Sequence, residues 1–176
     1  MIETKKIYTI ELQEEILQEA TELITKRYAN DPSFLAIYLG GSIVDGTFGE
    51  YEKPVHFDAE SRLGSDIDVI LIMKNRYGSV LLSREEQEKY GVRHIFPNRS
   101  EEVPVYRVID ETGQDIFLHE KHPIEPMIIT EALFEGWLSG KYKWGGKKPF
   151  PELAKDFKVL KETDRLKEIR KKNTGE

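Results

Sequence analysis

The sequence contains no cysteine among its 176 residues. This absence excludes disulfides, thiolate zinc sites and a cysteine nucleophile, and it is compatible with a reducing compartment. Any metal ion that the protein binds must therefore be held by oxygen or imidazole ligands.

The sequence also lacks long apolar runs and an excess of positive charge. No apolar run approaches the roughly 20 residues that a membrane helix needs, and residues 1–15 contain no secretory h-region. The formal net charge is −6, so no global positive field attracts a phosphate polymer. We therefore predict a cytoplasmic protein that acts neither on a membrane nor on long nucleic acid.

Hydrophobic periodicity predicts an α/β (α+β) protein. Residues 10–28 carry apolar side chains at mostly helical spacing, which indicates an amphipathic helix. Residues 34–39 (FLAIYL) and 66–73 (DIDVILIM) are short apolar runs that are typical of buried strands. Residues 152–172 are highly charged with a thin apolar stripe, so they predict a C-terminal helix.

The middle of the chain is predicted to add further strands. Residues 103–110 and 115–119 flank a turn as the two arms of a hairpin would. Residues 124–129 predict another strand, and Thr130 is the expected N-cap of a helix over residues 131–138.

A Gly40-Gly41-Ser42 turn follows the first predicted strand and precedes a brief helical turn over residues 42–48. Backbone N–H groups at a helix start lack intrahelical partners and carry the positive end of the helix dipole, so this arrangement favours an anion. The glycines allow a phosphate close to the backbone, and Ser42 adds a hydroxyl donor. Taken alone, the tripeptide is more often a plain turn.

Asp66 and Asp68 begin the second strand two residues apart. Their side chains are expected on one side of the strand, while Ile67, Val69 and Leu71 face the core. Two neighbouring carboxylates raise each other's pKa, and a divalent cation reverses that penalty. Carboxylate oxygens with substrate phosphates suit Mg²⁺. The alternative for this pair alone is a solvated strand entrance.

The two motifs together resemble the nucleotidyltransferases of the DNA polymerase β superfamily. The resemblance lies in LGGSIVDGTFG over residues 39–49 and LGSDIDVILIM over residues 63–73, and it extends loosely to Trp137. It implies a nucleotidyltransferase fold, with a small mixed β-sheet flanked by helices and a C-terminal helix. We divide the chain accordingly into a catalytic domain, residues 1–146, and a helical tail, residues 147–176.

The resemblance also assigns roles to the motif residues. Gly40, Gly41, Ser42 and Ser65 would bind a nucleoside triphosphate, ATP or another, as co-substrate. Asp66 and Asp68 would hold Mg²⁺, with two ions expected in all.

A third carboxylate is expected on a neighbouring strand, where it would bind the second ion or take the proton of the acceptor hydroxyl. Asp115 and Glu125 are both candidates. We favour Glu125 because it precedes the predicted strand-to-helix junction at Thr130-Glu131, as in aminoglycoside-modifying members of the superfamily.

These expectations lead to a predicted activity, which is transfer of a nucleoside monophosphate, AMP from ATP, to a hydroxyl of a small molecule such as an antibiotic. Acidic residues of the 49–64 loop would suit a cationic aminoglycoside. Two alternatives stay open: an antitoxin-like enzyme that adenylylates a partner protein, and a catalytically idle nucleotide-binding domain. A homodimer that completes the pocket is also compatible with the short C-terminal region.

Two segments each allow two interpretations. The polar loop over residues 49–64 is longer than in minimal superfamily members, and it either shapes the acceptor pocket or is a surface insertion. Residues 141–148 (KYKWGGKK) combine lysines with aromatic side chains. We interpret this segment as a flexible linker, with stacking on a base or contact with phosphates as the alternative.

Overall fold

The computed structural model describes most of the chain. The described residues are 8–48, 54–57, 60–63, 67–74, 82–97, 104–108, 116–117, 121–122, 124–146 and 148–176. None of the helices in these ranges is both long enough and apolar enough to cross a lipid bilayer.

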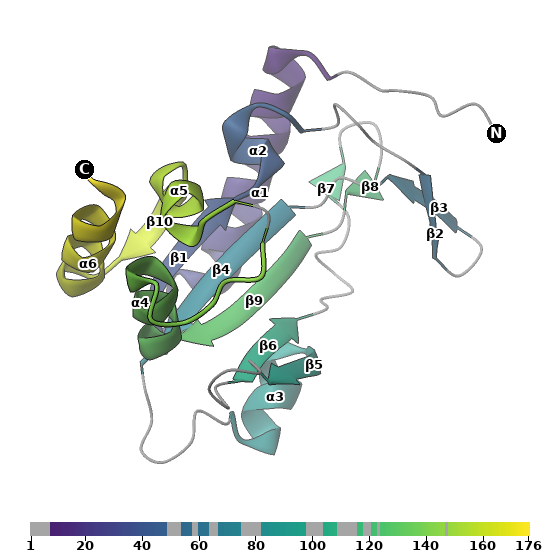
Figure 1. The fold of residues 1–176 in the computed structure, drawn as a ribbon. Coiled ribbons are helices and arrows are strands. Elements are labelled where there is room, and N and C mark those ends of the chain that lie inside the picture. The colour runs from purple at the N-terminus through teal and green to yellow at the C-terminus, as the bar shows by residue number, and fades with distance from the viewer. Residues whose placement is uncertain are drawn as a thin grey trace.

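A six-stranded mixed sheet forms the centre of the described structure (Figure 1). In order across the sheet, its strands are β10 (Lys158–Glu162), β1 (Phe34–Gly40), β4 (Ile67–Met73), β9 (Ile124–Thr130), β6 (Pro104–Val108) and β5 (Val92–Pro97). β4 and β9 run parallel, and the other neighbouring pairs run antiparallel. The predicted mixed sheet flanked by helices, with a C-terminal helix, is confirmed.

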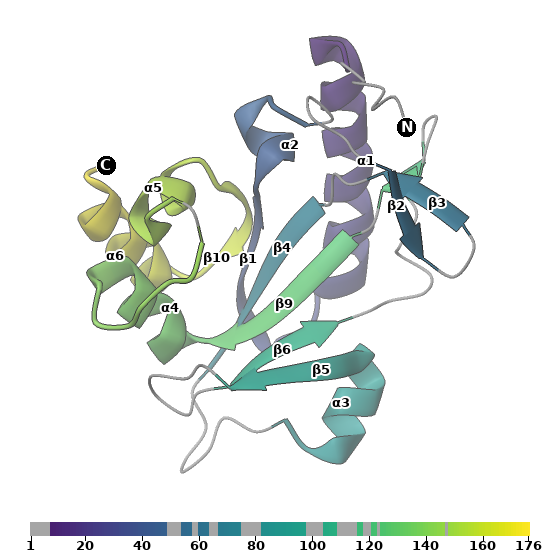
Figure 2. The same cartoon turned by 45° about the vertical axis from the view of Figure 1, so that its right-hand side comes forward.

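One face of the sheet is covered by α1 (Ile10–Tyr28), and we call it the α1 face (Figure 2). Thr9 caps this helix by accepting a hydrogen bond from the Leu12 N–H. Ile16, Ala20 and Ile24 are buried against Ile37, Leu39, Ile67, Val69 and Leu71 of the sheet. The predicted helix and the inward orientation of the three β4 residues are therefore confirmed.

Three short helices cover the opposite face, which we call the aromatic face. They are α4 (Glu131–Ser139), α5 (Phe150–Lys155) and α6 (Asp164–Thr174). Thr130 caps α4 by accepting from the Leu133 N–H, as the sequence predicts. The buried side chains on this face include Tyr38, Phe134, Trp137 and Phe150.

A buried polar network joins β1, β10 and α6 within the aromatic face. The Tyr38 hydroxyl donates to Glu162 Oε1 at 2.7 Å, and Arg170 Nε donates to the same oxygen at 2.7 Å. The Glu162 and Arg170 side chains are 6% and 8% exposed. Burial and the neighbouring Glu162 raise the pKa of Tyr38, so its hydroxyl stays protonated.

The single C-terminal helix expected over residues 152–172 is wrong. α5 ends at Lys155, residues Lys158–Glu162 form β10, and α6 begins after its N-cap Thr163. Tertiary pairing explains the difference, because β10 satisfies the backbone groups along the edge of β1.

The hairpin expected from residues 103–110 and 115–119 is also wrong. β6 lies between β5 and β9, whereas β7 (Ile116–Phe117) pairs with β8 (Lys121–His122). The turn-like composition between the two segments does not fix which strands pair. The proposed 49–64 loop contains a two-stranded pair, β2 (Pro54–Phe57) and β3 (Glu60–Leu63).

A further helix, α3 (Arg84–Tyr90), was not predicted. Its sequence signal is the capping box in which Ser83 and Glu86 bond each other's backbone N–H, followed by Gly91 at the C-cap.

Candidate active site

The Gly40-Gly41-Ser42 turn lies between β1 and α2 (Ser42–Asp45), as the sequence predicts. Gly41 has a φ of +79° and a ψ of −160°, a conformation that strongly favours glycine. A Cβ at this position would overlap the carboxylate of Asp68. The turn therefore requires glycine both for its backbone and for the space that Asp68 occupies.

Asp68 is the second residue of β4, and its side chain is exposed beside this turn. Its neighbours Ile67 and Val69 belong to the core of the α1 face, while Ile70 belongs to that of the aromatic face. By the alternation of a strand, Asp68 lies on the aromatic face.

Three adjacent strands bring candidate residues to the same level of the sheet. Gly40 of β1 is the register partner of Asp68 of β4, and Asp68 is the register partner of Glu125 of β9. Strands pair about 4.8 Å apart, so the backbones of these three residues form a short row across the sheet. The fold thus places Glu125 on the strand next to Asp68.

Other predicted site residues cannot be located in the same way. Asp66, Ser65 and Asp115 lie outside the described residues, as do the side chain of Glu125 and half of the 49–64 loop. Within the described part of the chain, no group of three or more histidines or carboxylates could hold a metal ion. Two of the three predicted ligand side chains fall outside that part, so the assignment of the ligands stays a prediction.

A cavity of about 150 Å³ lies against the turn and Asp68. Gly40, Gly41 and Asp68 line one side of it. The remaining lining residues are apolar or aromatic and lie on β4, β9 and α5 or near α5 in the sequence. They are Val69, Ile70, Met127, Trp144, Phe150, Leu153 and Phe157. A carboxylate at the mouth of an apolar cavity matches the usual make-up of a small-molecule site.

Phe157 connects this cavity to the buried network of the aromatic face. Its ring stacks on Tyr38 at a centroid distance of 5.4 Å, and a Cβ on Gly40 would lie 2.9 Å from its Cε1. Gly40 therefore allows the Phe157 ring to pack close to the backbone at the end of β1. This wall of the cavity thus packs on the ring of Tyr38, whose hydroxyl donates to Glu162.

The described residues of segment 141–148 take part in this region, so the interpretation of the segment as a flexible linker is wrong. Trp144 lines the cavity beside Asp68, and its ring packs on Trp137 and Phe150 at centroid distances of 4.7 and 5.0 Å. Lys148 Nζ lies 3.8 Å from Asp45 Oδ2 at the end of α2. The alternation of lysine and aromatic residues was the sequence signal for this contribution.

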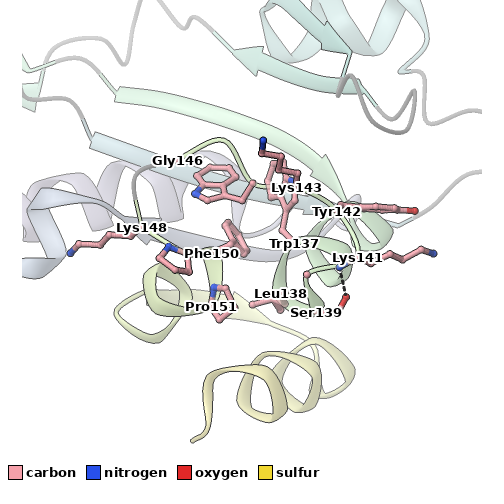
Figure 3. A pocket seen from close by; sticks show the side chains of 13 residues that line it. Trp137, Leu138, Ser139, Lys141, Tyr142, Lys143, Gly146, Lys148, Phe150 and Pro151 are labelled. Atoms are coloured by element: carbon pink, nitrogen blue, oxygen red, sulfur yellow. Dashed lines mark hydrogen bonds between the residues drawn. The ribbon is translucent and has the colours of Figure 1, made fainter.

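The described residues of segment 137–151 also line a second, larger pocket of about 770 Å³ (Figure 3). Trp144 and Phe150 line both this pocket and the smaller cavity at Asp68. The two spaces are therefore neighbours, separated by shared aromatic side chains.

Comparison with known proteins gave no further assignment, since neither the protein-family models nor the curated proteins contain a match to this chain.

Proposed function

We propose that this protein is a magnesium-dependent nucleotidyltransferase that transfers AMP from ATP to a hydroxyl group of a small molecule. The observation that carries the proposal is the row Gly40, Asp68 and Glu125 across β1, β4 and β9, with the Gly41 backbone against the Asp68 carboxylate. This arrangement supports the superfamily resemblance, because residues from three separate motifs meet at one end of the sheet.

The donor set suits Mg²⁺. Asp68 offers an exposed carboxylate, and Asp66 and Glu125 are the further oxygen ligands that the proposal requires. When bound, Mg²⁺ supplies positive charge that neutralises the triphosphate and the charge developing in transfer.

The remaining steps belong to the protein. The backbone N–H groups that follow Gly41 bind the phosphates, and the Ser42 hydroxyl donates a hydrogen bond to them. The carboxylate of Glu125 accepts the proton of the acceptor hydroxyl as that oxygen attacks the α-phosphorus, and pyrophosphate leaves on the opposite side. Positioning of the two reactants supplies most of the catalysis in such a reaction.

Two further features complete the proposal. We place the enzyme in the cytoplasm, where ATP and Mg²⁺ are available. The chain has no cysteine, so its fold does not depend on an oxidising compartment in which disulfides form. A homodimer is proposed as the assembly that completes the acceptor site.

Calorimetric titration of ATP with and without Mg²⁺ tests this function. Wild type should bind ATP in a magnesium-dependent manner, and Asp68→Asn should weaken that binding at least about tenfold, because a lost ligand or charged partner is worth roughly 1.5–3 kcal/mol. Gly41→Ala should weaken it as well, since the new Cβ displaces the Asp68 carboxylate.

Asp164→Asn is the matched control, because Asp164 is an exposed aspartate in the first turn of α6. It should bind ATP as wild type does. If folded wild type shows no magnesium-dependent ATP binding, the enzymatic proposal fails and an idle domain takes its place.

A further inference from the structure

The larger pocket has an unusual polar lining for an acidic protein. Lys141, Lys143 and Lys148 line it, and none of its described lining residues is acidic, although the chain as a whole carries a net charge of −6. In Figure 3, the side chains of Lys148 and Lys141 extend away from Phe150 in opposite directions. The charged side chains that line the pocket are therefore all positive, and they lie around an aromatic centre.

Two indole groups add unused hydrogen-bond donors to this region. Trp137 is 5% exposed, and neither its Nε1–H nor that of Trp144 has a hydrogen-bond partner among the described residues. An unpaired buried N–H destabilises the fold, so such donors are commonly satisfied by a ligand or an ordered water. Among the lining side chains, Ser139 and Tyr142 are the ones that can also accept.

The size of the pocket and its aromatic lining suit a small molecule with a flat ring. Its volume of about 770 Å³ lies within the usual range of ligand sites. Aromatic rings at the floor favour stacking of another ring, and lysine ammonium groups favour phosphate or carboxylate oxygens. A cationic ligand would meet like charges here, which weakens its binding.

The pocket also lies where an acceptor would have to bind. It shares Trp144 and Phe150 with the cavity that Gly41 and Asp68 line. Lys148 reaches across to Asp45 of α2, directly after the glycine turn. A molecule held in the larger pocket would have the candidate active site at its side.

We propose that the larger pocket binds the acceptor substrate, and that this acceptor is an anion with a phosphate or carboxylate group next to a flat ring. The assignment of the ligand as acceptor rests on the proposed nucleotidyltransferase function. The inference that the pocket prefers an anionic ligand does not depend on that function. This inference replaces the cationic aminoglycoside that the acidic 49–64 loop suggests from the sequence.

Tryptophan fluorescence is a direct probe, because the chain contains two tryptophans and both line this pocket. The full chain is titrated without Mg²⁺ with AMP, which carries a ring and a phosphate, and with adenosine, which carries the same ring without the phosphate. AMP should change the fluorescence and bind at least about tenfold more tightly than adenosine, since a charge-assisted contact is worth about 1.5–3 kcal/mol. A cationic aminoglycoside should bind more weakly than AMP.

Lysine substitutions locate the site. Lys143→Gln/Lys148→Gln should weaken AMP binding about tenfold. The matched control, Lys155→Gln/Lys158→Gln, removes two exposed lysines of α5 and β10 that do not line the pocket, and it should bind AMP as wild type does. Equal affinity for AMP and adenosine, an unchanged affinity in the Lys143/Lys148 variant, or tighter binding of the aminoglycoside would overturn the proposal.

Asp68→Asn separates the two proposals. It should weaken magnesium-dependent ATP binding at least about tenfold and leave the magnesium-free, lysine-dependent binding of AMP intact. If AMP binding is lost together with the Asp68 carboxylate, the probe sits at the metal site and the larger pocket is not its site. If AMP binds through the lysines but wild type never binds ATP with Mg²⁺, the pocket prefers anions, and its role as an acceptor site is overturned.

Discussion

The two faces of the central sheet are covered in opposite ways. α1, a helix of 19 residues, lies over one face, where Ile43 of α2 and Tyr90 of α3 join the same core, whereas three short helices and the described residues of segment 141–149 cover the other face. Both cores contain aromatic side chains, but those of the aromatic face form one continuous set of ring contacts, which joins Tyr38, Phe134, Trp137, Trp144, Phe150 and Phe157. A cover assembled from short pieces leaves spaces between them, and both cavities of the candidate site lie on that face.

The largest expected effect on stability concerns the buried network of the aromatic face. Glu162→Ala removes the acceptor of both the Tyr38 hydroxyl and the Arg170 guanidinium, and it leaves Arg170 buried without this partner. We expect a loss of about 3–5 kcal/mol in the free energy of unfolding, which urea denaturation measures.

Glu168→Ala provides the control for this prediction, because Glu168 is an exposed carboxylate on α6. It should change the unfolding free energy by less than about 0.5 kcal/mol. A similarly small effect of Glu162→Ala would mean that packing, rather than the ion pair, holds β10 and α6 on the sheet.

A somewhat smaller effect is expected on the α1 face. Ile24 is 2% exposed in the core of that face, so Ile24→Ala should cost about 2–4 kcal/mol through lost burial and a new cavity. Urea denaturation again measures the change, and the exposed neighbour Thr25→Ala is the control. Because Ile24 lies on the opposite side of the sheet from Asp68, ATP affinity of the folded variant should not change. A large loss of affinity would show that the two faces are not independent.

The smallest effect concerns Asp31, in the turn between α1 and β1. Burial opposes ionisation, but hydrogen bonds from the Ser33 N–H and the Tyr90 hydroxyl and the charge of Lys89 outweigh it, so the pKa of Asp31 is lowered. Because the pKa of Asp31 in the folded protein lies below its unfolded value near 3.8, the ionised carboxylate stabilises the fold at pH values above 3.8. This contribution is lost as the pH falls below that value, through the folded pKa.

Asp31→Asn should therefore cost about 1 kcal/mol near neutral pH and progressively less as the pH falls below about 3.8. Urea denaturation over a series of pH values checks this. A cost that stays constant down to pH 2 would assign the effect to the shape of the side chain and not to its charge. Tyr90→Phe removes one donor to the carboxylate, and it should show part of the same pH dependence.

The difference between the faces also explains what the sequence could predict. Residues 10–28 have helical periodicity, and the β1 and β4 runs are apolar and bounded by turn residues, so local patterns were sufficient. β10 could not be recognised in this way. Its sequence, KVLKE, is compatible with a helix, and it becomes a strand by pairing with β1 far away in the chain.

The candidate site shows the same difference between local sequence patterns and tertiary packing. Gly41 and Asp68 belong to short local motifs, and the structure places them side by side. Phe150 and Phe157 belong to no such motif, and they reach the site because α4 and α5 fold back across the sheet. The local sequence therefore indicated the chemistry, whereas tertiary packing determined which side chains form the walls.

The pairing of β10 with β1 also bears on how the protein folds during synthesis. Tyr38 and Glu162, which bond across this edge, are 124 positions apart in the sequence. Until residues 158–162 have left the ribosome, the apolar strand FLAIYL has one edge without its final partner, and such an edge can pair with another nascent chain. The last strand to be synthesised thus acts as an intramolecular shield for the first, and a chaperone that holds β1 during this interval would protect the yield of folded protein.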